Sequence, residues 1–208
     1  MGEGILSERK QIRPEDSIIT SEQYEHHYTS YYKSHQHKLR EIKARLLKAG
    51  TSYSDSIFSL FRVLKGEEGW LRNSVILHST YFNSLGNGKN RPSPQLFNML
   101  IRDFGSLEEW VEEFSAMGIS ARGWAVLGLD LLEGKLINCL CDEHAEGHWM
   151  IYPIIALDVF EHAYQQDYGS NIKSYVKHFL NNIDWTFANV GLETAQEMYN
   201  VLRTKNNS

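Results

Sequence analysis

Cysteine is scarce in this sequence, in which Cys139 and Cys141 are the only two. A disulfide-rich scaffold is therefore excluded, because such folds depend on several bridges. The two cysteines alternate along a segment that has the pattern of a strand, so their side chains should lie on one face. We expect them to be reduced packing residues rather than a disulfide or a metal-binding pair.

Long apolar runs and an excess of basic residues are also missing. No apolar stretch approaches the roughly 20 residues of a membrane-spanning helix, and residues 1–16 lack the apolar core of a secretion signal. The 21 Lys and Arg against 26 Asp and Glu leave a net charge of −5, whereas nucleic-acid binding needs a concentrated basic surface. We therefore expect no membrane and no nucleic-acid partner, and we expect the cytoplasm as the compartment.

A long helical pattern opens the chain. It begins at a capping box formed by Thr20 and Gln23 and runs to residue 49. One face of this helix carries the stripe His27, Tyr31, His35, Leu39, Ile42 and Leu46. Imidazole and phenol groups occupy the start of the stripe and aliphatic groups its end, whereas a helix that only packs would more often be aliphatic throughout.

A second helical region follows. The pattern predicts a short helix over 54–64, a break near Gly66 and Gly69, and a long helix over 70–85 with His78 in the middle of its apolar stripe. Two long helices with a modest connection favour an antiparallel hairpin. Such a hairpin can bring the His78 stripe against the stripe of the first helix.

The remaining chain mixes helices and strands behind a linker at 86–94. The patterns predict helices over 95–104 and 106–117, strands over 123–130, 136–141 and 149–157, and helices over 161–168, 172–182 and 192–203. The fold class is therefore α+β. We expect an N-terminal arm over 1–19, a long antiparallel helical hairpin over 20–89, and an α/β domain with a small three-stranded antiparallel sheet over 90–208.

Candidate functional residues gather around 158–162, where the sequence reads Asp-Val-Phe-Glu-His after an apolar strand. Asp158 and His162 can face one point if the chain turns into a helix at the strand exit. The simpler interpretation is a helix-capping Asp158 and a surface His162. His27 and His78 on their helical stripes favour a metal site instead, although His78 could also be a buried histidine bonded to a carbonyl.

These four side chains would offer three neutral imidazoles and one carboxylate. Such ligands suit iron, manganese or zinc. Iron and manganese can change oxidation state with these ligands in place, whereas zinc cannot perform redox chemistry. The residues alone therefore leave the choice between a redox centre and a zinc site open.

In several segments the sequence resembles the iron/manganese superoxide dismutase family. The segment 158–164 reads Asp-Val-Phe-Glu-His-Ala-Tyr, where the family has Trp in place of Phe. The segment 78–85 is similar to the surroundings of the family's second ligand, and the pair at 27–28 to its first. Gly-Trp-Ala at 123–125 matches the start of the family's sheet, and 175–185 looks like its closing helix. The resemblance covers about residues 20–205, in the family's order.

This resemblance implies an enzyme that converts superoxide anion to dioxygen and hydrogen peroxide by one-electron metal cycling. It makes His27, His78, Asp158 and His162 the ligands of one iron or manganese ion per subunit. It also implies a homodimer, with a tetramer as the alternative. In the family, the residue at Glu161 reaches the metal-ligating histidine of the other subunit, Tyr164 lines the interface, and Trp124 lines the site.

The sequence departs from the family around the expected ligands. The family's gateway tyrosine falls at His35, and the histidine four positions before it falls at Tyr31. The manganese-type outer-sphere glutamine aligns with His144, although a shifted loop could place Glu143 there, and the iron-type position falls at Ser74. His35, Tyr31 and His144 would then form the proton relay, with His144 titrating near neutrality.

Other interpretations remain open at this level. The alignment of the first helix could slip by one residue, which would make His26 the ligand. The altered gateway motivates a metal-binding scaffold protein on this fold with little dismutase activity. A zinc-dependent hydrolase is a third interpretation, although the sequence offers no obvious general base for it.

Overall fold

The computed structural model describes residues 17–49, 51 and 57–206. The expected arm therefore lies outside the description except for residues 17–19. Of the short helix expected over 54–64, residues 54–56 lie outside the description and residues 60–64 belong to the following long helix. Within the described part, Ile19 is buried, and the backbone N–H and hydroxyl of Thr20 both donate to Asp167. The chain is thus anchored to α6 (Glu161–Tyr168) just before the first helix begins.

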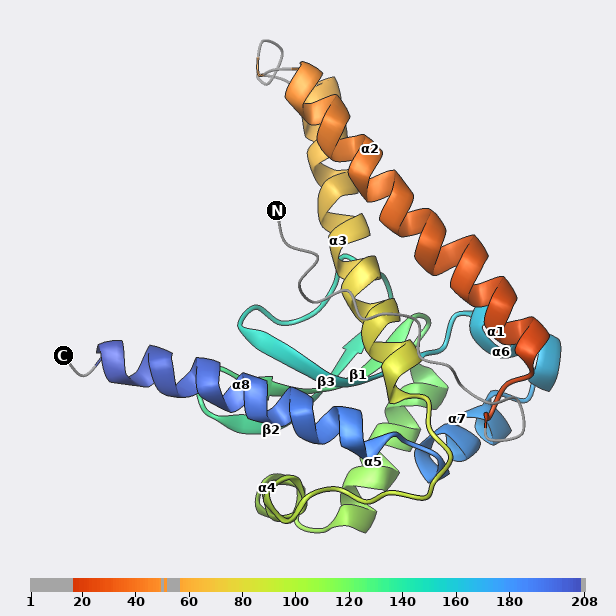
Figure 1. The fold of residues 1–208 in the computed structure, drawn as a ribbon, viewed down its shortest axis with the longest axis vertical. Helices are drawn as coiled ribbons and strands as arrows, with labels where there is room; N and C mark the ends of the chain where they lie inside the picture. The colour runs from red at the N-terminus through yellow and green to blue at the C-terminus, as the bar shows by residue number, and fades with distance from the viewer. Residues whose placement is uncertain (1–16, 50, 52–56, 207–208) are drawn as a thin grey trace.

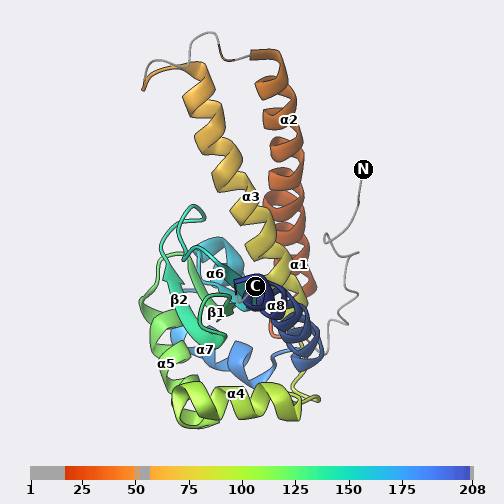
Figure 2. The same cartoon turned by 90° about the vertical axis from the view of Figure 1, so that its left-hand side faces the viewer.

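A helical hairpin dominates the N-terminal part. α1 (Ser21–His27), the π-helical turn η2 (Tyr28–Lys33) and α2 (Ser34–Ala49) form one continuous rod. The rod packs against α3 (Leu60–Ser84), and Figures 1 and 2 show the pair projecting together from the rest of the molecule. The expected antiparallel hairpin is therefore confirmed.

The π-helical turn explains the regular spacing of the first stripe. An α-helix turns 100° per residue, so a residue four positions further along lies about 40° away around the helix axis. A stripe with steps of four residues would therefore move steadily around an α-helix. A turn whose N–H groups bond five residues back is wider and reduces this drift. The stripe residues His27, Tyr31 and His35 consequently stay on the face that looks toward α3 and α6.

The C-terminal part contains a small sheet and its covering helices. Its elements are α4 (Pro94–Phe104), α5 (Leu107–Ser120), β1 (Trp124–Asp130), β2 (Lys135–Cys141), β3 (Ile151–Asp158), α6, α7 (Ile172–Asn181) and α8 (Trp185–Asn206). The strands pair antiparallel in the order β2-β1-β3, with Trp124 opposite both Cys141 and Asp158. The expected α+β class and three-stranded sheet are confirmed, and the domain division at 89/90 stays a prediction.

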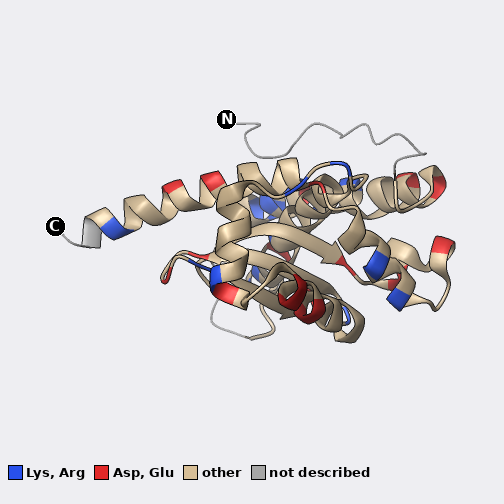
Figure 3. Cartoon of the chain, turned by 90° about the horizontal axis from the view of Figure 1, so that it is seen from below, with Lys and Arg blue, Asp and Glu red and all other residues tan. Residues whose placement is uncertain are grey.

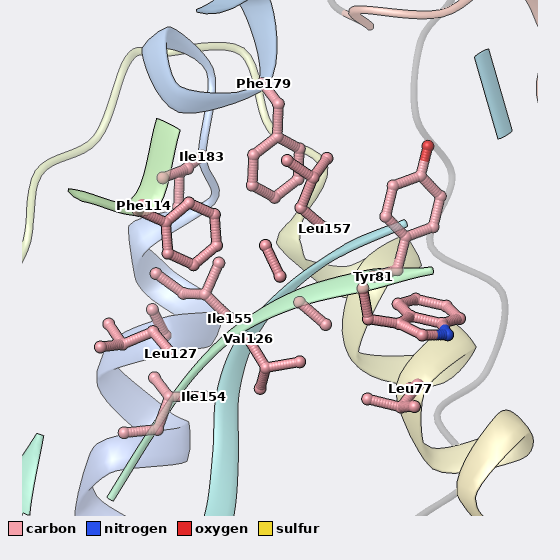
Figure 4. Close-up of a cluster of buried hydrophobic side chains, with 14 of the residues drawn as sticks. Leu77, Tyr81, Phe114, Val126, Leu127, Ile154, Ile155, Leu157, Phe179 and Ile183 are labelled. Atoms are coloured by element: carbon pink, nitrogen blue, oxygen red, sulfur yellow. The ribbon is translucent and has the colours of Figure 1, made fainter. Parts of the chain in front are cut away.

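The core fills the space on both sides of the strands. In Figure 4, Leu77 and Tyr81 of α3 lie on one side of the strands, and Phe114 and Phe179 lie on the other. Successive residues of β3 therefore point alternately toward the hairpin and toward the other helices. This alternation decides which side chains at the end of β3 can reach the hairpin.

The expected break near Gly66 and Gly69 is wrong, because α3 runs through both glycines. Leu64 and Leu71 are both buried against α2, so the apolar stripe continues across the glycines and stabilises the helix. A glycine in a helix is unfavourable by about 1 kcal/mol relative to alanine. The burial of Leu64 and Leu71 against α2 can offset this cost.

These two glycines allow a stability prediction. A Cβ added at Gly66 or Gly69 would meet no atom within 4 Å. Gly66→Ala and Gly69→Ala should each raise the free energy of unfolding by about 0.4–1 kcal/mol, because alanine restricts the unfolded chain. Urea denaturation measures the change. Gly105→Ala is the matched control and should destabilise, because Gly105 has a φ of +95°. Lower stability of both helix variants would contradict this account.

The last helix begins earlier than expected. The pattern predicts a helix over 192–203, whereas α8 starts at Trp185. The Asp184 carboxylate accepts hydrogen bonds from the N–H groups of Thr186 and Phe187 and so caps the new start. α8 passes through Gly191 beside Ile154, whose Cα would be in ordinary van der Waals contact, at 3.7 Å, with a Cβ at that position.

Two surface properties complete the description. No helix in the described ranges is both long and apolar enough to cross a membrane. Figure 3 shows Lys and Arg residues dispersed among Asp and Glu residues on the side seen from below.

Candidate metal centre

His27 and His78 face each other across the hairpin. His27 is the last residue of α1, His78 lies in α3, and both are fully buried. Their ring centroids are 5.2 Å apart. His26 is exposed, and its Nδ1 lies 3.5 Å from the Ser30 hydroxyl. The geometry therefore favours His27 over the alternative His26.

Asp158 and His162 approach the same point from the C-terminal part. A Cβ placed at Gly118 of α5 would lie 3.1 Å from Leu157 Cδ2, so Leu157 faces the helices behind the sheet. The next residue, Asp158, consequently faces the hairpin. Its Oδ1 accepts a hydrogen bond of 3.0 Å from the Phe160 N–H, which leaves Oδ2 for the site. His162 follows in the first turn of α6.

The four side chains converge on one centre. The Nε2 atoms of His27, His162 and His78 lie 3.1, 3.5 and 3.6 Å from Asp158 Oδ2. All four atoms are buried and have no hydrogen-bond partner among the described residues. Buried polar atoms are normally satisfied, and four lone-pair donors gathered within 4.8 Å fit a bound cation. The residues present therefore fit an iron or manganese ion.

Burial of the two histidines, and the histidines beside Asp158, favour the protonation states that a metal needs. It lowers the pKa of His27 and lowers that of His78 even further, although the Asp158 carboxylate opposes both shifts. Burial alone would raise the pKa of Asp158, but the neighbouring His162 and His27 side chains outweigh it and hold the pKa below its usual range. Neutral imidazoles and an ionised carboxylate are the forms that bind metal.

Hydrogen bonds from neighbouring groups orient the expected ligands. His78 Nδ1–H donates to the Ser74 carbonyl at 2.8 Å, so the Nε2 lone pair faces the centre. The carbonyl of Asp158 accepts a hydrogen bond of 2.9 Å from the Tyr175 hydroxyl, which also bonds the Tyr81 hydroxyl at 3.0 Å. Sequence reasoning did not find the two tyrosines, because at helical spacing they look like ordinary core residues.

Helix α1 is also tied to α6 by an unexpected contact. The Thr20 side chain caps the Gln23 N–H as expected. The Gln23 side chain does not return to Thr20, however, and instead donates to the carbonyl of His162 at 2.7 Å. This contact fixes the distance between the segments that carry His27 and His162.

His144 is the loop residue that reaches the centre. It is buried, whereas Glu143 is exposed, so the geometry favours His144 for the outer-sphere position. The Trp124 indole N–H donates to His144 Nδ1 at 3.2 Å, and Trp70 stacks on the imidazole at 4.3 Å. Burial lowers the pKa of His144 to about 4. The expected titration near neutrality is therefore wrong.

The Trp124 contact also decides how His144 can act. The ligating atoms of His35, His78 and His144 lie within 4.8 Å of one another, which resembles a second metal group. An indole N–H only donates, so His144 Nδ1 must accept and the proton of the neutral ring sits on Nε2. His144 thus provides an N–H donor rather than a second free lone pair, and we assign no second ion to this group.

His35 and Tyr31 occupy the stripe between the hairpin helices. His35 is buried, and its Nδ1 lies 2.6 Å from the Ser74 hydroxyl, which leaves Nε2 for the site. Burial lowers its pKa to about 4. Tyr31 stacks on the His162 ring with centroids 3.7 Å apart. The structure therefore brings both residues beside the centre.

Glu161 and Tyr164 lie on the outer side of the site. Glu161 is exposed and lines a groove of about 860 Å³ together with Tyr31 and His162. Tyr164 borders the same groove while its ring stacks on Tyr175 at 5.0 Å. The groove leads directly to the edge of the centre that is formed by His162. The side chain of His162 is 16% exposed.

Known proteins are similar to this chain in sequence. Residues 92–190 match the family described as iron/manganese superoxide dismutases, C-terminal domain. An iron superoxide dismutase of Aquifex aeolicus is 34% identical over 209 residues, covering 98% of each chain. One of Cupriavidus metallidurans is 38% identical over 162 residues, 76% of this chain and 81% of the relative. A manganese superoxide dismutase of Halobacterium salinarum is 40% identical over 126 residues, 60% and 63% of the two chains. The protein therefore belongs to the iron/manganese superoxide dismutase family.

Proposed function

We propose that this protein converts superoxide to dioxygen and hydrogen peroxide at the centre formed by His27, His78, Asp158 and His162. The observation that carries the proposal is the convergence of their four buried, unpartnered ligand atoms on one point. Relatives named for iron and for manganese support both metals. We assign one such ion to each subunit.

The four side chains would hold the ion between α1, α3 and the sheet, with the groove at the His162 edge as the route from solvent. The bound ion supplies reversible one-electron transfer, by which one superoxide is oxidised and a second is reduced after taking up two protons. The single carboxylate among neutral imidazoles leaves the site with net positive charge, which favours an anionic substrate.

We assign the protein's part in proton delivery to His144, His35 and Tyr31. The Nε2–H of His144 is a hydrogen-bond donor whose tautomer Trp124 maintains. The Ser74 hydroxyl joins His35 and His78, since it lies 2.6 Å from the Nδ1 of His35 and 3.2 Å from that of His78. Tyr31 borders the groove and touches the His162 ring, so its hydroxyl can link the site with solvent.

We further propose a homodimer formed over the groove beside α6. In this arrangement Glu161 would accept a hydrogen bond from the metal-ligating histidine of the partner subunit, and Tyr164 would line the contact. The exposure of Glu161 beside the partly exposed His162 supports this assignment. The cytoplasm as compartment and the possible tetramer stay predictions. Sedimentation of wild type and Glu161→Ala tests the assembly, and unchanged dimers in the variant would remove Glu161 from the contact.

Metal analysis followed by a superoxide-consumption assay tests the function. Protein loaded separately with iron and with manganese should consume superoxide rapidly in at least one form. The replacement of the family's gateway tyrosine by His35 favours a second candidate, a metal-binding scaffold with little activity. Bound iron or manganese without turnover would support that scaffold. Binding of zinc alone would contradict both.

The structure predicts how activity depends on pH through His144. Its pKa of about 4 leaves the ring neutral at neutral pH, so His144→Gln should keep the shape of the rate profile between about pH 6.5 and 9. The rate itself should fall by up to about 100-fold, because an outer-sphere contact is altered. Stopped-flow superoxide decay measures both, with the exposed His37→Ala as control. A wild-type step near pH 7 that vanishes in His144→Gln would contradict the assignment.

A further inference from the structure

A pair of thiols lies on the edge strand of the sheet, away from the four expected ligands. Cys139 and Cys141 stand two residues apart on β2, and their sulfur atoms are 3.8 Å apart. Only 4% and 2% of the two residues are exposed. The sequence has no other cysteine, and the proposed dismutase chemistry uses neither thiol.

A cavity gives small molecules access to both thiols. It has a volume of about 560 Å³ and is lined by both cysteines, by Trp70 of α3 and by residues of the loop between β2 and β3. One of these, Gly147, has a φ of +131°, and a Cβ there would lie only 3.8 Å from Cys141 Sγ. The loop thus passes close to the sulfur atoms without placing a side chain over them at this position. The cavity therefore places open space next to both cysteine residues.

The two thiols differ in reactivity. A hydrogen bond from the Cys141 thiol lowers the pKa of Cys139, and the backbone N–H of His148 adds to this effect. The same hydrogen bond, together with burial, raises the pKa of Cys141. Cys139 is therefore the better nucleophile, because the thiolate is the reactive form. Cys141 retains its proton beside it.

We propose that Cys139 and Cys141 are a peroxide-sensitive dithiol that closes to a reversible disulfide within β2. The Cys139 sulfur attacks one oxygen of hydrogen peroxide, the O–O bond breaks, and the leaving hydroxide takes a proton to become water. The resulting sulfenic acid is attacked by the Cys141 sulfur, so that the S–O bond breaks, the S–S bond forms and a second water leaves. Two thiols are oxidised and one peroxide is reduced to two waters.

The position of the pair makes closure feasible and reversible. Residues two apart on a strand are separated by about 6.6 Å, within the Cα–Cα range of roughly 4.4–6.8 Å found for disulfides but near its upper end. Among the described residues, β2 is an edge strand that pairs only with β1, so it can bend without disturbing a second ladder. A bond formed across such a span should be strained and easily reduced.

The proposed function would supply the oxidant, so the physiological setting of the dithiol rests on that proposal. The oxidation itself needs only peroxide. Metal-loaded protein is therefore reduced, freed of reductant and treated with a small excess of added hydrogen peroxide. Free thiols are then counted under denaturing conditions, and the peptide that contains both cysteines is examined by mass spectrometry.

We expect the free thiols to fall from two to none, the peptide to lose two hydrogens, and dithiothreitol to reverse both changes. Cys141→Ser should stop at a sulfenic acid that dimedone traps. Cys139→Ser should react at least about tenfold more slowly, because burial still raises the pKa of the remaining Cys141 thiol and because Cys141 lacks the backbone hydrogen bond from His148 that favours the Cys139 thiolate. Two free thiols after treatment, disulfides only between chains, or equal rates in wild type and Cys139→Ser would overturn the proposal. Disulfide formation in protein that consumes no superoxide would instead overturn the proposed function and leave the dithiol intact.

Discussion

His162→Ala is expected to lose both the bound metal and superoxide consumption. His162 Nε2 is one of the four converging ligand atoms, which are buried and have no partner among the described residues, and it lies 3.5 Å from Asp158 Oδ2. Altering a residue that only supports a metal ligand lowers metal affinity by roughly 10–100-fold. Removing a ligand itself should exceed that range, so we expect a loss of affinity greater than about 100-fold.

His162 is the best ligand position for this test because its side chain is 16% exposed, whereas His27, His78 and Asp158 are fully buried. Truncation at His162 is therefore the least damaging to folding. Elemental analysis and stopped-flow superoxide decay give the two readouts, and circular dichroism checks the fold. The matched control is His37→Ala, which removes an exposed imidazole from α2. Full metal occupancy in His162→Ala would exclude His162 from the site.

Acid should release the metal and destabilise the protein below about pH 6.5, the ordinary pKa of histidine. Burial lowers the pKa values of His27 and His78 in the folded state. The unfolded chain consequently binds more protons in this range, so stability falls as the pH falls. Each imidazole contributes a slope of up to about 1.4 kcal/mol per pH unit. Protons also compete with the metal for the ring nitrogens.

The lowered pKa of Asp158 acts in a lower window. Its contribution to stability is present above about pH 3.9, the ordinary value of aspartate, and is lost as the pH falls below that. Urea denaturation between about pH 8 and pH 4.5, with metal content measured after gel filtration, isolates the histidine effect from the later aspartate effect. His37→Ala should leave the slope unchanged. A stability that stays constant from pH 7 to about pH 5 would contradict neutral, buried His27 and His78.

The four residues proposed to form the metal centre could be predicted from sequence, because the position of each one in its helix or strand depends on local geometry. Asp158 ends an apolar strand and His162 follows at the start of a helix, so the backbone alone brings them near one point. His27 and His78 lie on helical stripes whose period identifies the buried face. The order of these segments and their resemblance to one family made the fold and the metal class predictable in advance.

Long-range contacts decided what the sequence left open. The choice of His144 over Glu143 depends on a loop without periodicity, in which the Trp124 indole fixes one imidazole. The continuity of α3 through Gly66 and Gly69 depends on packing against α2, which overrides local preference.

The sequence by itself determined the chemistry of the four proposed ligands, their spacing along the chain and the elements that carry them, because helical and strand periods are local properties. Only the tertiary structure decided protonation and proximity. Burial makes His144 a neutral donor instead of a group that titrates near pH 7. Residues of α3, of β2 and of the loop after β2 together line a cavity beside two adjacent thiols. Both properties depend on desolvation and on contacts between distant segments, which no local pattern encodes.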